Sequence, residues 1–287
     1  MDFYITTVVN SIFLGMYYVL LALGLTIIFN IMKIFNFAHG EIYMIGSLLT
    51  FIFFRHLDLN FGVTAVLVIA IVCIIGFILE RVFFRPLKGK LVGSLLVALG
   101  LTLLIAGIAE AAFGSVFGYE DLSVPSVFKG TVSVGSITLS TERIAVIIIT
   151  AAIVVGLQIF LNKTRMGLAM RAVAQDDEVA SLHGININRT SSIAFMMSCG
   201  LAGVAALLLS PVFFINPYLG MSAVLKALIV VVLGGIGSFM GAIVGGLLLG
   251  FIEAFGVLAV GQFSQTLGFI IIMLVLLFRP RGLMGRE

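Results

Sequence analysis

The longest polar stretch of the sequence is NKTRMGLAMRAVAQDDEVASLHGININR, at residues 162–189. The rest of the chain consists mostly of long runs of hydrophobic residues. Hydrophobic residues make up 61% of the chain and charged residues 10%, and the mean hydropathy is +1.27. This composition is typical of a polytopic all-α membrane protein. The polar stretch is then a loop between spans, and the side of the membrane on which it lies fixes the topology of the whole chain.

A short helix of about two turns is predicted inside this loop, with both ends marked. Asp176 can cap the first turn, and Asp177 and Glu178 place negative charge where the helix dipole favours it. Gly184 provides the left-handed residue that ends the helix. Three side chains at helical spacing share one face: Val179, Leu182 and His183. Two interpretations stay open from these features: a helix that docks in a groove of a soluble partner, or an ordinary helical cytoplasmic loop.

The net charge, the two cysteines and the N-terminal residues narrow the kinds of protein that this chain can be. The net charge of +3 says little about nucleic acid, and we predict no nucleic-acid partner. Cys73 and Cys199 lie in apolar runs without metal-ligand spacing, so we expect them to pack as small hydrophobic residues. The N-terminal MDFYITTVVNS has no basic region and no small-residue cleavage site, so we expect the first apolar run to be a retained span. We predict one transmembrane domain over residues 1–287.

The apolar runs predict roughly eight to nine hydrophobic segments. They lie at residues 8–29, 42–54, 61–84, 91–113, 143–161, 191–209, 227–260 and 267–278. Residues 211–226 are mixed in character. The polar segment 114–142 contains TVSVGSITLST, whose alternation predicts a small hairpin with Gly135 and Ser136 at the turn.

The basic residues predict the orientation. With alternating spans, twelve of the 16 lie on the side of residues 162–190 and the C-terminus: Lys33, Arg81, Arg85, Lys88, Lys90, Lys163, Arg165, Arg171, Arg189, Arg279, Arg281 and Arg286. The other side holds Arg55, Lys129, Arg143 and Lys226. We therefore place the loop 162–190 and the C-terminus in the cytoplasm, and the N-terminus and segment 114–142 outside. Nine crossings, or seven if residues 227–260 form a re-entrant hairpin, both fit.

The first interruption of an apolar run is IMKIFNFAHGE, at residues 31–41. A broken helix leaves backbone groups unpaired, so it is tolerated only inside protein or beside a wet cavity, and in transporters it commonly frames the substrate site. We predict that Asn36, His39 and Glu41 line a substrate pathway, with Asn36 capping a helix that resumes at Phe37. His39 and Glu41 are two residues apart and make a poor metal or acid–base pair. The alternative is that these groups lie at the membrane boundary and only tie helices together.

The second interruption is GGIGS, at residues 234–238. We predict that Gly234, Gly235, Gly237 and Ser238 unwind the helix and line the pathway. Glu253 lies deep in the following span, and an intramembrane carboxylate is a functional candidate by default. The alternatives are close helix packing and a neutral structural role for Glu253. The packing interpretation covers the glycines at four-residue spacing and those on an adjacent stripe: Gly237, Gly241, Gly245, Gly246 and Gly250.

The sequence contains no enzyme signature. It lacks the phosphate loop G-x-x-x-x-G-K-[ST] and the G-x-S-x-G elbow. We predict no catalytic residue, no metal site and no cofactor in this chain. If nucleotide drives transport, ATP and Mg²⁺ are bound by partner chains.

Three motifs give the chain a resemblance to the permease family of branched-chain amino-acid ABC importers over essentially its full length. NFAHGE begins at Asn36 and is very specific to that family. The pattern E-x-A-x-x-x-G at Glu178, Ala180 and Gly184 resembles the coupling motif of ABC permeases, with Val179 where the general pattern has Ala. KALIVVVLGGIGSFMGAIVGG and the ending LLFRPRGLMG resemble the family's C-terminal signature.

The resemblance implies a bacterial inner-membrane subunit, the shorter of two paired permeases. Its implied partners are a related second permease in a heterodimer, two ABC ATPases and a periplasmic substrate-binding protein. The loop helix would dock on an ATPase through Asp177, Glu178, Val179, Ala180, Leu182, His183 and Gly184. The solute stays open between branched-chain amino acids and urea, short amides or aromatic and other carboxylates. An ion-coupled carrier using the intramembrane titratable groups is a more distant alternative.

Overall fold

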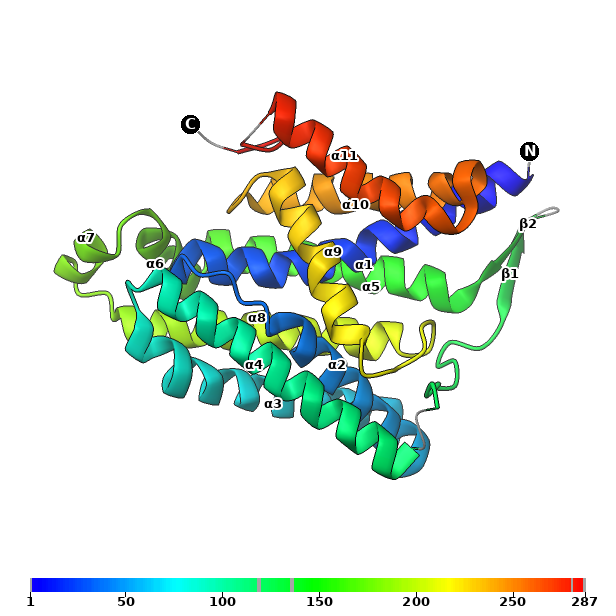
Figure 1. Ribbon diagram of the computed structural model, residues 1–287, viewed down its shortest axis with the longest axis horizontal. Helices are drawn as coiled ribbons and strands as arrows, with labels where there is room; N and C mark the ends of the chain where they lie inside the picture. The colour runs from blue at the N-terminus through cyan, green and yellow to red at the C-terminus, as the bar shows by residue number, and fades with distance from the viewer. Residues whose placement is uncertain (1, 118–119, 135–136, 280, 286–287) are drawn as a thin grey trace. The chain divides into compact units, whose positions relative to one another are not determined.

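The computed structural model describes residues 2–117, 120–134, 137–279 and 281–285 (Figure 1). The α-helices are α1 (Asp2–Met32), α2 (His39–Thr50), α3 (Phe61–Leu79), α4 (Leu91–Ala112), α5 (Thr141–Lys163), α6 (Arg165–Gln175), α7 (Asp177–Leu182), α8 (Ile187–Leu209), α9 (Leu219–Gly234), α10 (Phe239–Val260) and α11 (Ser264–Phe278). Shorter helical turns are η1 (Phe51–His56), η2 (Glu80–Phe84), η3 (Arg85–Leu87), η4 (Phe113–Phe117) and η5 (Gly261–Phe263). Strands β1 (Thr131–Val134) and β2 (Ile137–Ser140) pair antiparallel.

Six helices in the described part of the chain are long and apolar enough to cross a membrane: α1, α3, α4, α5, α8 and α10. α9 and α11 contribute two shorter apolar helices, and α2 continues directly into η1. These elements confirm the predicted polytopic helical class. The predicted eight to nine segments become six long spans together with these shorter helices.

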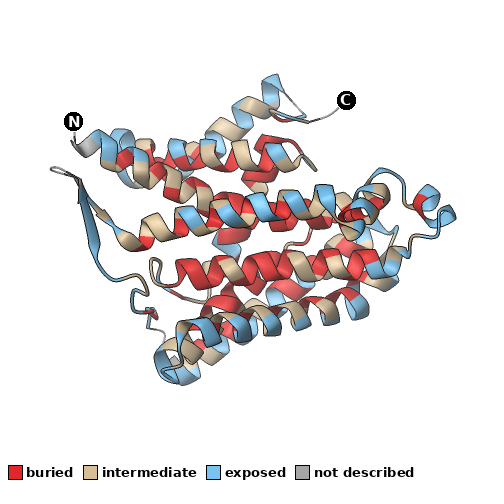
Figure 2. Cartoon of the chain, turned by 180° about the vertical axis from the view of Figure 1, so that it is seen from behind, coloured by how far each residue is buried: buried red, intermediate tan, exposed pale blue. Residues whose placement is uncertain are grey.

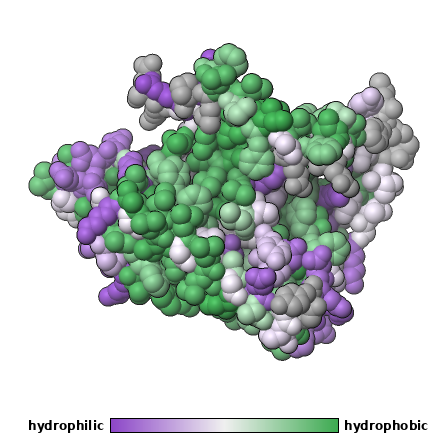
Figure 3. Space-filling model, viewed as in Figure 1, coloured by the Kyte–Doolittle hydropathy of each residue, from purple (hydrophilic) through white to green (hydrophobic). Residues whose placement is uncertain are grey.

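The helices differ in how much of their surface is left exposed. α8 is buried along most of its length, whereas α5 carries a row of exposed residues (Figure 2). α4 exposes leucine, valine and isoleucine side chains, and hydrophobic side chains cover its face in Figure 3, while hydrophilic ones gather around α7. An exposed face this apolar is stable when lipid covers it.

The chain divides into two compact units made of discontinuous stretches. Unit 1 comprises Met1–Thr26, Ser126–Ile153 and Leu225–Glu287, and unit 2 comprises Ile27–Pro125 and Val154–Val224. Helices α1, α5 and α9 each pass from one unit into the other. The interpretation of residues 1–287 as one transmembrane domain stays a prediction.

In unit 2, small residues let α8 pack closely against α2 and α3. A Cβ on Gly46 of α2 would lie 2.8 Å from the Ala206 Cβ, and a Cβ on Gly76 of α3 would lie 2.6 Å from the Cys199 Sγ. Small residues permit such approach where lipid offers no hydrophobic driving force between helices.

In unit 1, the glycines of α10 face two different helices. A Cβ on Gly241 would lie 2.2 Å from the Gly234 carbonyl oxygen of α9, and a Cβ on Gly250 would lie 2.3 Å from the Gly15 nitrogen of α1. The packing alternative considered for these glycines therefore holds for Gly241 and Gly250.

Several element boundaries differ from the sequence-based expectation. The helix after the first interruption begins at His39, not Phe37, with Ala38 at its N-cap, so the predicted capping by Asn36 is wrong. Lys226, placed at the outer end of a mixed segment, lies in the middle of α9. The hairpin is confirmed by the β1–β2 pairing, while the turn predicted at Gly135 and Ser136 lies outside the described residues.

Candidate functional site

The helix predicted in the polar loop is present as α7. Asp176 caps it, because the Val179 backbone N–H donates to Asp176 Oδ1 at 3.0 Å. Gly184 follows with φ of +79°, the left-handed conformation expected of the residue that ends the helix. The prediction of a short, capped helix at this place is confirmed, and its role as a contact for an ATPase stays a prediction.

α7 presents an apolar surface beside acidic side chains. Leu182 is 84% exposed and Val179 is 49% exposed, whereas Ala180 is buried against the rest of unit 2. His183 is exposed, and its Nδ1 lies 2.9 Å from the Val179 carbonyl oxygen. An isolated exposed leucine is ordinary, but one at the tip of a short capped helix can serve as an anchor in a partner's pocket.

A second helix in the same loop, α6, escaped sequence analysis. Thr164 caps it, with Thr164 Oγ1 accepting from the Gly167 N–H at 3.0 Å. Lys33, just beyond α1, donates from Nζ to the Ala174 carbonyl oxygen at 3.0 Å. The Thr164 cap is the local signal from which α6 could have been found.

The polar residues of the first interruption lie in the interior of unit 2. Asn36, His39 and Glu41 are all buried, and His39 Nδ1 lies 3.3 Å from Ser198 Oγ of α8. Among the described residues, no hydrogen-bond partner is found for the side-chain amide of Asn36 or the carboxylate of Glu41. Buried polar groups are nearly always paired, so Asn36 and Glu41 are candidates for contact with a bound water, ion or solute.

Glu41 lies against the first turn of α9. A Cβ on Gly220 would lie 2.5 Å from Glu41 Oε2, and a Cβ on Gly40 would lie 2.0 Å from the Gly220 carbonyl oxygen. The structure thus brings the beginnings of α2 and α9 into backbone contact at Gly40, where only glycine fits, while a side chain at position 220 would displace the Glu41 carboxylate. Sequence analysis identified Glu41 but missed Gly220 and Ser198.

The structure pairs Glu253 with two residues that sequence analysis did not select. Lys226 of α9 forms an ion pair with Glu253 of α10, and the Tyr18 hydroxyl of α1 donates to the same carboxylate. The Lys226 and Glu253 side chains are only 13% and 8% exposed. Because charged side chains inside a membrane pair with one another, the lysine and the glutamate satisfy each other here.

The glycines of the second interruption pack against the chain's own C-terminal segment. The Leu283 N–H donates to the Leu233 carbonyl oxygen and the Met284 N–H donates to the Gly234 carbonyl oxygen, both at 2.9 Å. Gly235 and Gly237 have φ of +105° and +84°, and Ser238 caps α10. These residues are not brought together with Glu253, which is fourteen residues further along α10 than Phe239, a rise of about 21 Å.

We predict that replacing Gly235 with leucine reduces transport to below about a tenth of the wild-type rate. An L-residue at this φ is strained by about 1–2 kcal/mol, and its Cβ would lie 2.5 Å from the Gly285 nitrogen. Uptake per assembled complex measures the effect. Gly100→Leu is the matched control, because no atom lies within 4 Å of a Cβ at that helical position. Wild-type uptake by the Gly235 variant would show that the second interruption tolerates side chains and plays no part in transport.

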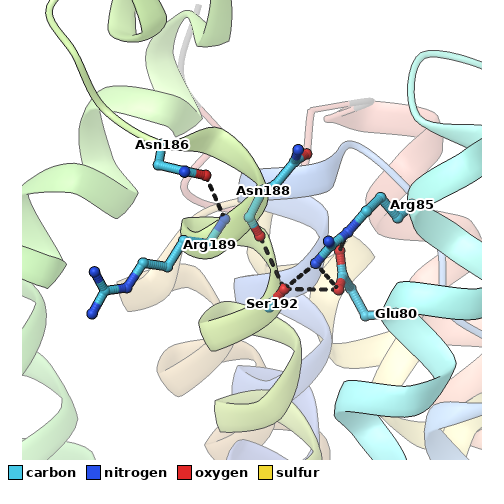
Figure 4. Close-up of polar contacts among 6 residues, drawn as sticks. All are labelled: Glu80, Arg85, Asn186, Asn188, Arg189 and Ser192. Carbon is cyan, nitrogen blue, oxygen red and sulfur yellow. Dashed lines mark hydrogen bonds and ion pairs between the residues drawn. The ribbon is translucent and has the colours of Figure 1, made fainter.

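A further polar cluster joins η2 and η3, which directly follow α3, to the beginning of α8 (Figure 4). Arg85 forms an ion pair with Glu80 at 2.8 Å and also donates to Ser192 Oγ at 2.6 Å. Sequence analysis counted Arg85 only as a cytoplasmic charge. In the described residues, no group of three or more His, Cys, Asp and Glu side chains could hold a metal ion.

Comparison with known proteins relates the whole chain to transport permeases. A family model described as "Branched-chain amino acid transport system / permease component" matches residues 7–278. The high-affinity branched-chain amino acid transport system permease protein BraD of Pseudomonas aeruginosa is 36% identical, covering 99% of this chain and 96% of BraD. The corresponding permease protein LivH of Escherichia coli is 35% identical over the same shares.

A more distant relative is also described as a branched-chain amino acid transport permease. A probable branched-chain amino acid transport permease protein LivH of Methanocaldococcus jannaschii is 28% identical, covering 93% of this chain and 88% of that protein. No solved structure matches the chain significantly. The family model and the full-length identity to BraD and LivH show that the chain belongs to the permease component family of branched-chain amino acid transport systems.

Proposed function

We propose that this protein is the membrane permease subunit of an ATP-driven, binding-protein-dependent importer of branched-chain amino acids. The observation that carries the proposal is the near full-length identity to BraD and LivH, whose names describe high-affinity branched-chain amino acid transport. The burial of Asn36 and Glu41 without partners among the described residues supports a pathway along unit 2.

Within this proposal, the energy for transport comes from other chains. Two ABC ATPases bind ATP and Mg²⁺, a second related permease forms a heterodimer with this chain, and a periplasmic binding protein delivers the solute. α7 is the contact for one ATPase, with Leu182 as the apolar anchor and Val179 beside it. Hydrolysis then moves α7, and the helices attached to it open the pathway alternately to the two sides of the membrane.

The proposed orientation places the N-terminus outside and the C-terminus in the cytoplasm. Unit 1 adds support for nine crossings over seven, because Leu283 and Met284 bond directly to the residues that end α9. The second interruption therefore lies at the same level as the C-terminal segment. If that segment is at the cytoplasmic surface, α9 has to reach that surface as well, which a re-entrant hairpin from the outside would not do.

The orientation predicts opposite labelling of two exposed positions. In a Cys73→Ser, Cys199→Ser background, Ser123→Cys should react with a membrane-impermeant maleimide added to the periplasmic face. Gln175→Cys should react only after the membrane is permeabilised. Both native residues are exposed, so access alone distinguishes them. The reverse labelling pattern would overturn the orientation and with it the cytoplasmic position of α7.

Transport by the reconstituted complex tests the function. Proteoliposomes holding this chain, its partner permease, both ATPases and the binding protein should accumulate leucine, isoleucine and valine when ATP is supplied on the ATPase side. Uptake of urea or benzoate in place of the amino acids would support the alternative solutes. Uptake by this chain alone, driven by an ion gradient, would instead support an ion-coupled carrier.

A further inference from the structure

The coupling helix α7 is joined to α8 without a loose segment between them. The Gly184 N–H donates to the Ser181 carbonyl oxygen at 2.9 Å, and the Ile185 N–H donates to the Ala180 carbonyl oxygen at 3.2 Å. Asn186 then caps α8 through its side chain. The residues that follow α7 are thus hydrogen-bonded back to it and lead directly into the first turn of α8.

At the second turn of α8, three polar side chains form a closed cluster that we call the 80–85–192 cluster (Figure 4). Arg85 donates from Nε to Glu80 Oε1 at 3.2 Å and from Nη2 to Glu80 Oε2 at 2.8 Å. Arg85 Nη2 also donates to Ser192 Oγ at 2.6 Å, and Ser192 Oγ lies 2.8 Å from Glu80 Oε2. Each member of the cluster therefore contacts the other two.

The geometry of the cluster restrains α3 and α8 relative to each other within unit 2. The Glu80 side chain is 1% exposed and that of Arg85 is 29% exposed, so the carboxylate depends on these partners for its hydrogen bonds. A two-point contact between a guanidinium and a carboxylate fixes orientation as well as distance. The hydroxyl of Ser192 ties that fixed pair to α8.

An aromatic contact next to the cluster also holds η2 against α8. The rings of Phe84 and Phe195 are buried, with centroids 5.2 Å apart. Lys88 adds a link to α7 itself, with Nζ 3.2 Å from Asp177 Oδ2, but the Asp177 side chain is 47% exposed. Because solvent-exposed ion pairs contribute little and the Glu80 carboxylate is buried, the 80–85–192 cluster is the stronger of the two attachments.

We propose that Glu80, Arg85 and Ser192 are positioning residues that make α3 and α8 follow the coupling helix as one body. The proposal rests on the proposed function, in which an ATPase moves α7. This role requires no contact with nucleotide or solute. Their role is to convert the displacement of α7 into movement of helices that carry the buried residues of unit 2, such as Ser198 on α8, which contacts His39.

Two variants weaken the hydrogen bonds of the cluster without removing the ion pair between positions 80 and 85. Arg85→Lys keeps the positive charge but cannot make the two-point contact, and Ser192→Ala removes only the hydroxyl that ties the pair to α8. Arg81→Lys is the matched control, since Arg81 is exposed, lies over the Phe77 ring at 5.8 Å and takes no part in the cluster. Ser192→Ala keeps the proposal testable if Arg85→Lys fails to fold.

The first measurement is the number of leucine molecules taken up per ATP hydrolysed by the complete reconstituted complex. We expect this ratio to fall by about fivefold or more in Arg85→Lys and Ser192→Ala, with complex assembly and hydrolysis retained, and to stay within about twofold in Arg81→Lys. A purely structural role would lower the yield of complex and leave the ratio unchanged, and that result would overturn the proposal.

The second measurement needs no solute. In the complex trapped with ATP and vanadate, hydrogen exchange should change at residues 177–184 and 187–195 in the wild type. In Arg85→Lys the change should persist at 177–184 and be lost at 187–195. An unaltered change at both segments in the variant would overturn the proposal. Absence of leucine uptake by the wild type would instead count against the proposed function, and the exchange measurement would still decide the role of the cluster.

Discussion

The double variant Leu182→Ala, Gly184→Val is expected to lose substrate-stimulated ATP hydrolysis while the chain still inserts and folds. Leu182 is the most exposed apolar side chain of α7, and truncating an anchor residue typically costs more than about 1 kcal/mol of binding. Gly184 has φ of +79°, where a β-branched residue is strained by about 1–2 kcal/mol, so valine there deforms the end of the helix. The two changes act on the same short element and should combine.

The measurement separates assembly from activity. Complex formation with the ATPases and hydrolysis with the loaded binding protein are assayed independently, and recruitment of the binding protein should be unaffected. Leu168→Ala is the matched control, because Leu168 is an exposed leucine of the neighbouring helix α6. Normal stimulated hydrolysis and uptake in the double variant would mean that α7 is only a loop. The ATPase contact would then have to be sought at residues 81–90, the other large basic connection on that side.

Lys226→Met is expected to cause the largest loss of stability of any single change considered. The Lys226 and Glu253 side chains are 13% and 8% exposed, and removing one member of a buried ion pair typically costs about 3–5 kcal/mol, because the other charge is left uncompensated. A loss of that size is a large fraction of the roughly 5–15 kcal/mol by which native proteins are stable. The midpoint of thermal unfolding in detergent should fall, together with the amount of protein in the membrane.

The companion variant Lys226→Met, Glu253→Gln is expected to recover most of that stability. It removes both charges while keeping an acceptor for the Tyr18 hydroxyl. The wild type, Lys226→Met, Glu253→Gln and the double variant together form a double-mutant cycle, in which we expect a large coupling energy. The same variant tests whether Glu253 belongs to the substrate pathway. A stable double variant without transport would support that role, and a stable double variant with normal transport would restrict Glu253 to holding α9 and α10 together.

The elements that sequence analysis predicted correctly are those whose causes are local. α7 follows from a capping Asp176, acidic residues in its first turn and a Gly184 that can take positive φ, all within nine residues. The spans follow from length and hydropathy alone. The hairpin follows from the alternation of residues 131–140.

The contacts that sequence analysis missed join residues far apart in the chain. Lys226 looks like the charged end of a segment until α9 and α10 place it beside Glu253. Arg85 looks like one charge among many in a basic connection, and only the approach of α3 and α8 gives it Ser192 as a partner. No local pattern indicates that Gly220 lies beside Glu41, because this contact arises only where the beginnings of α2 and α9 come together.

The capping error at Asn36 has a related cause. Asn36 has the residue type and position of a helix cap, but the helix begins at His39 and the Asn36 side chain is buried instead. A capping preference worth about 1 kcal/mol is easily overridden by tertiary structure. The residue types were sufficient to select Asn36, His39 and Glu41 as candidates, and insufficient to say what they contact.

Site-specific photo-cross-linking from position 182 tests the central claim most directly, namely that this permease is driven through α7 by a partner ATPase. A photoreactive amino acid at Leu182 in the complete complex should form a covalent adduct with the ATPase subunit, and the yield should change between nucleotide-free and vanadate-trapped states. The same amino acid at Ile159, an exposed position within the span α5, should give no ATPase adduct. An assembled, hydrolysing complex in which position 182 forms no ATPase adduct in either state would contradict the account.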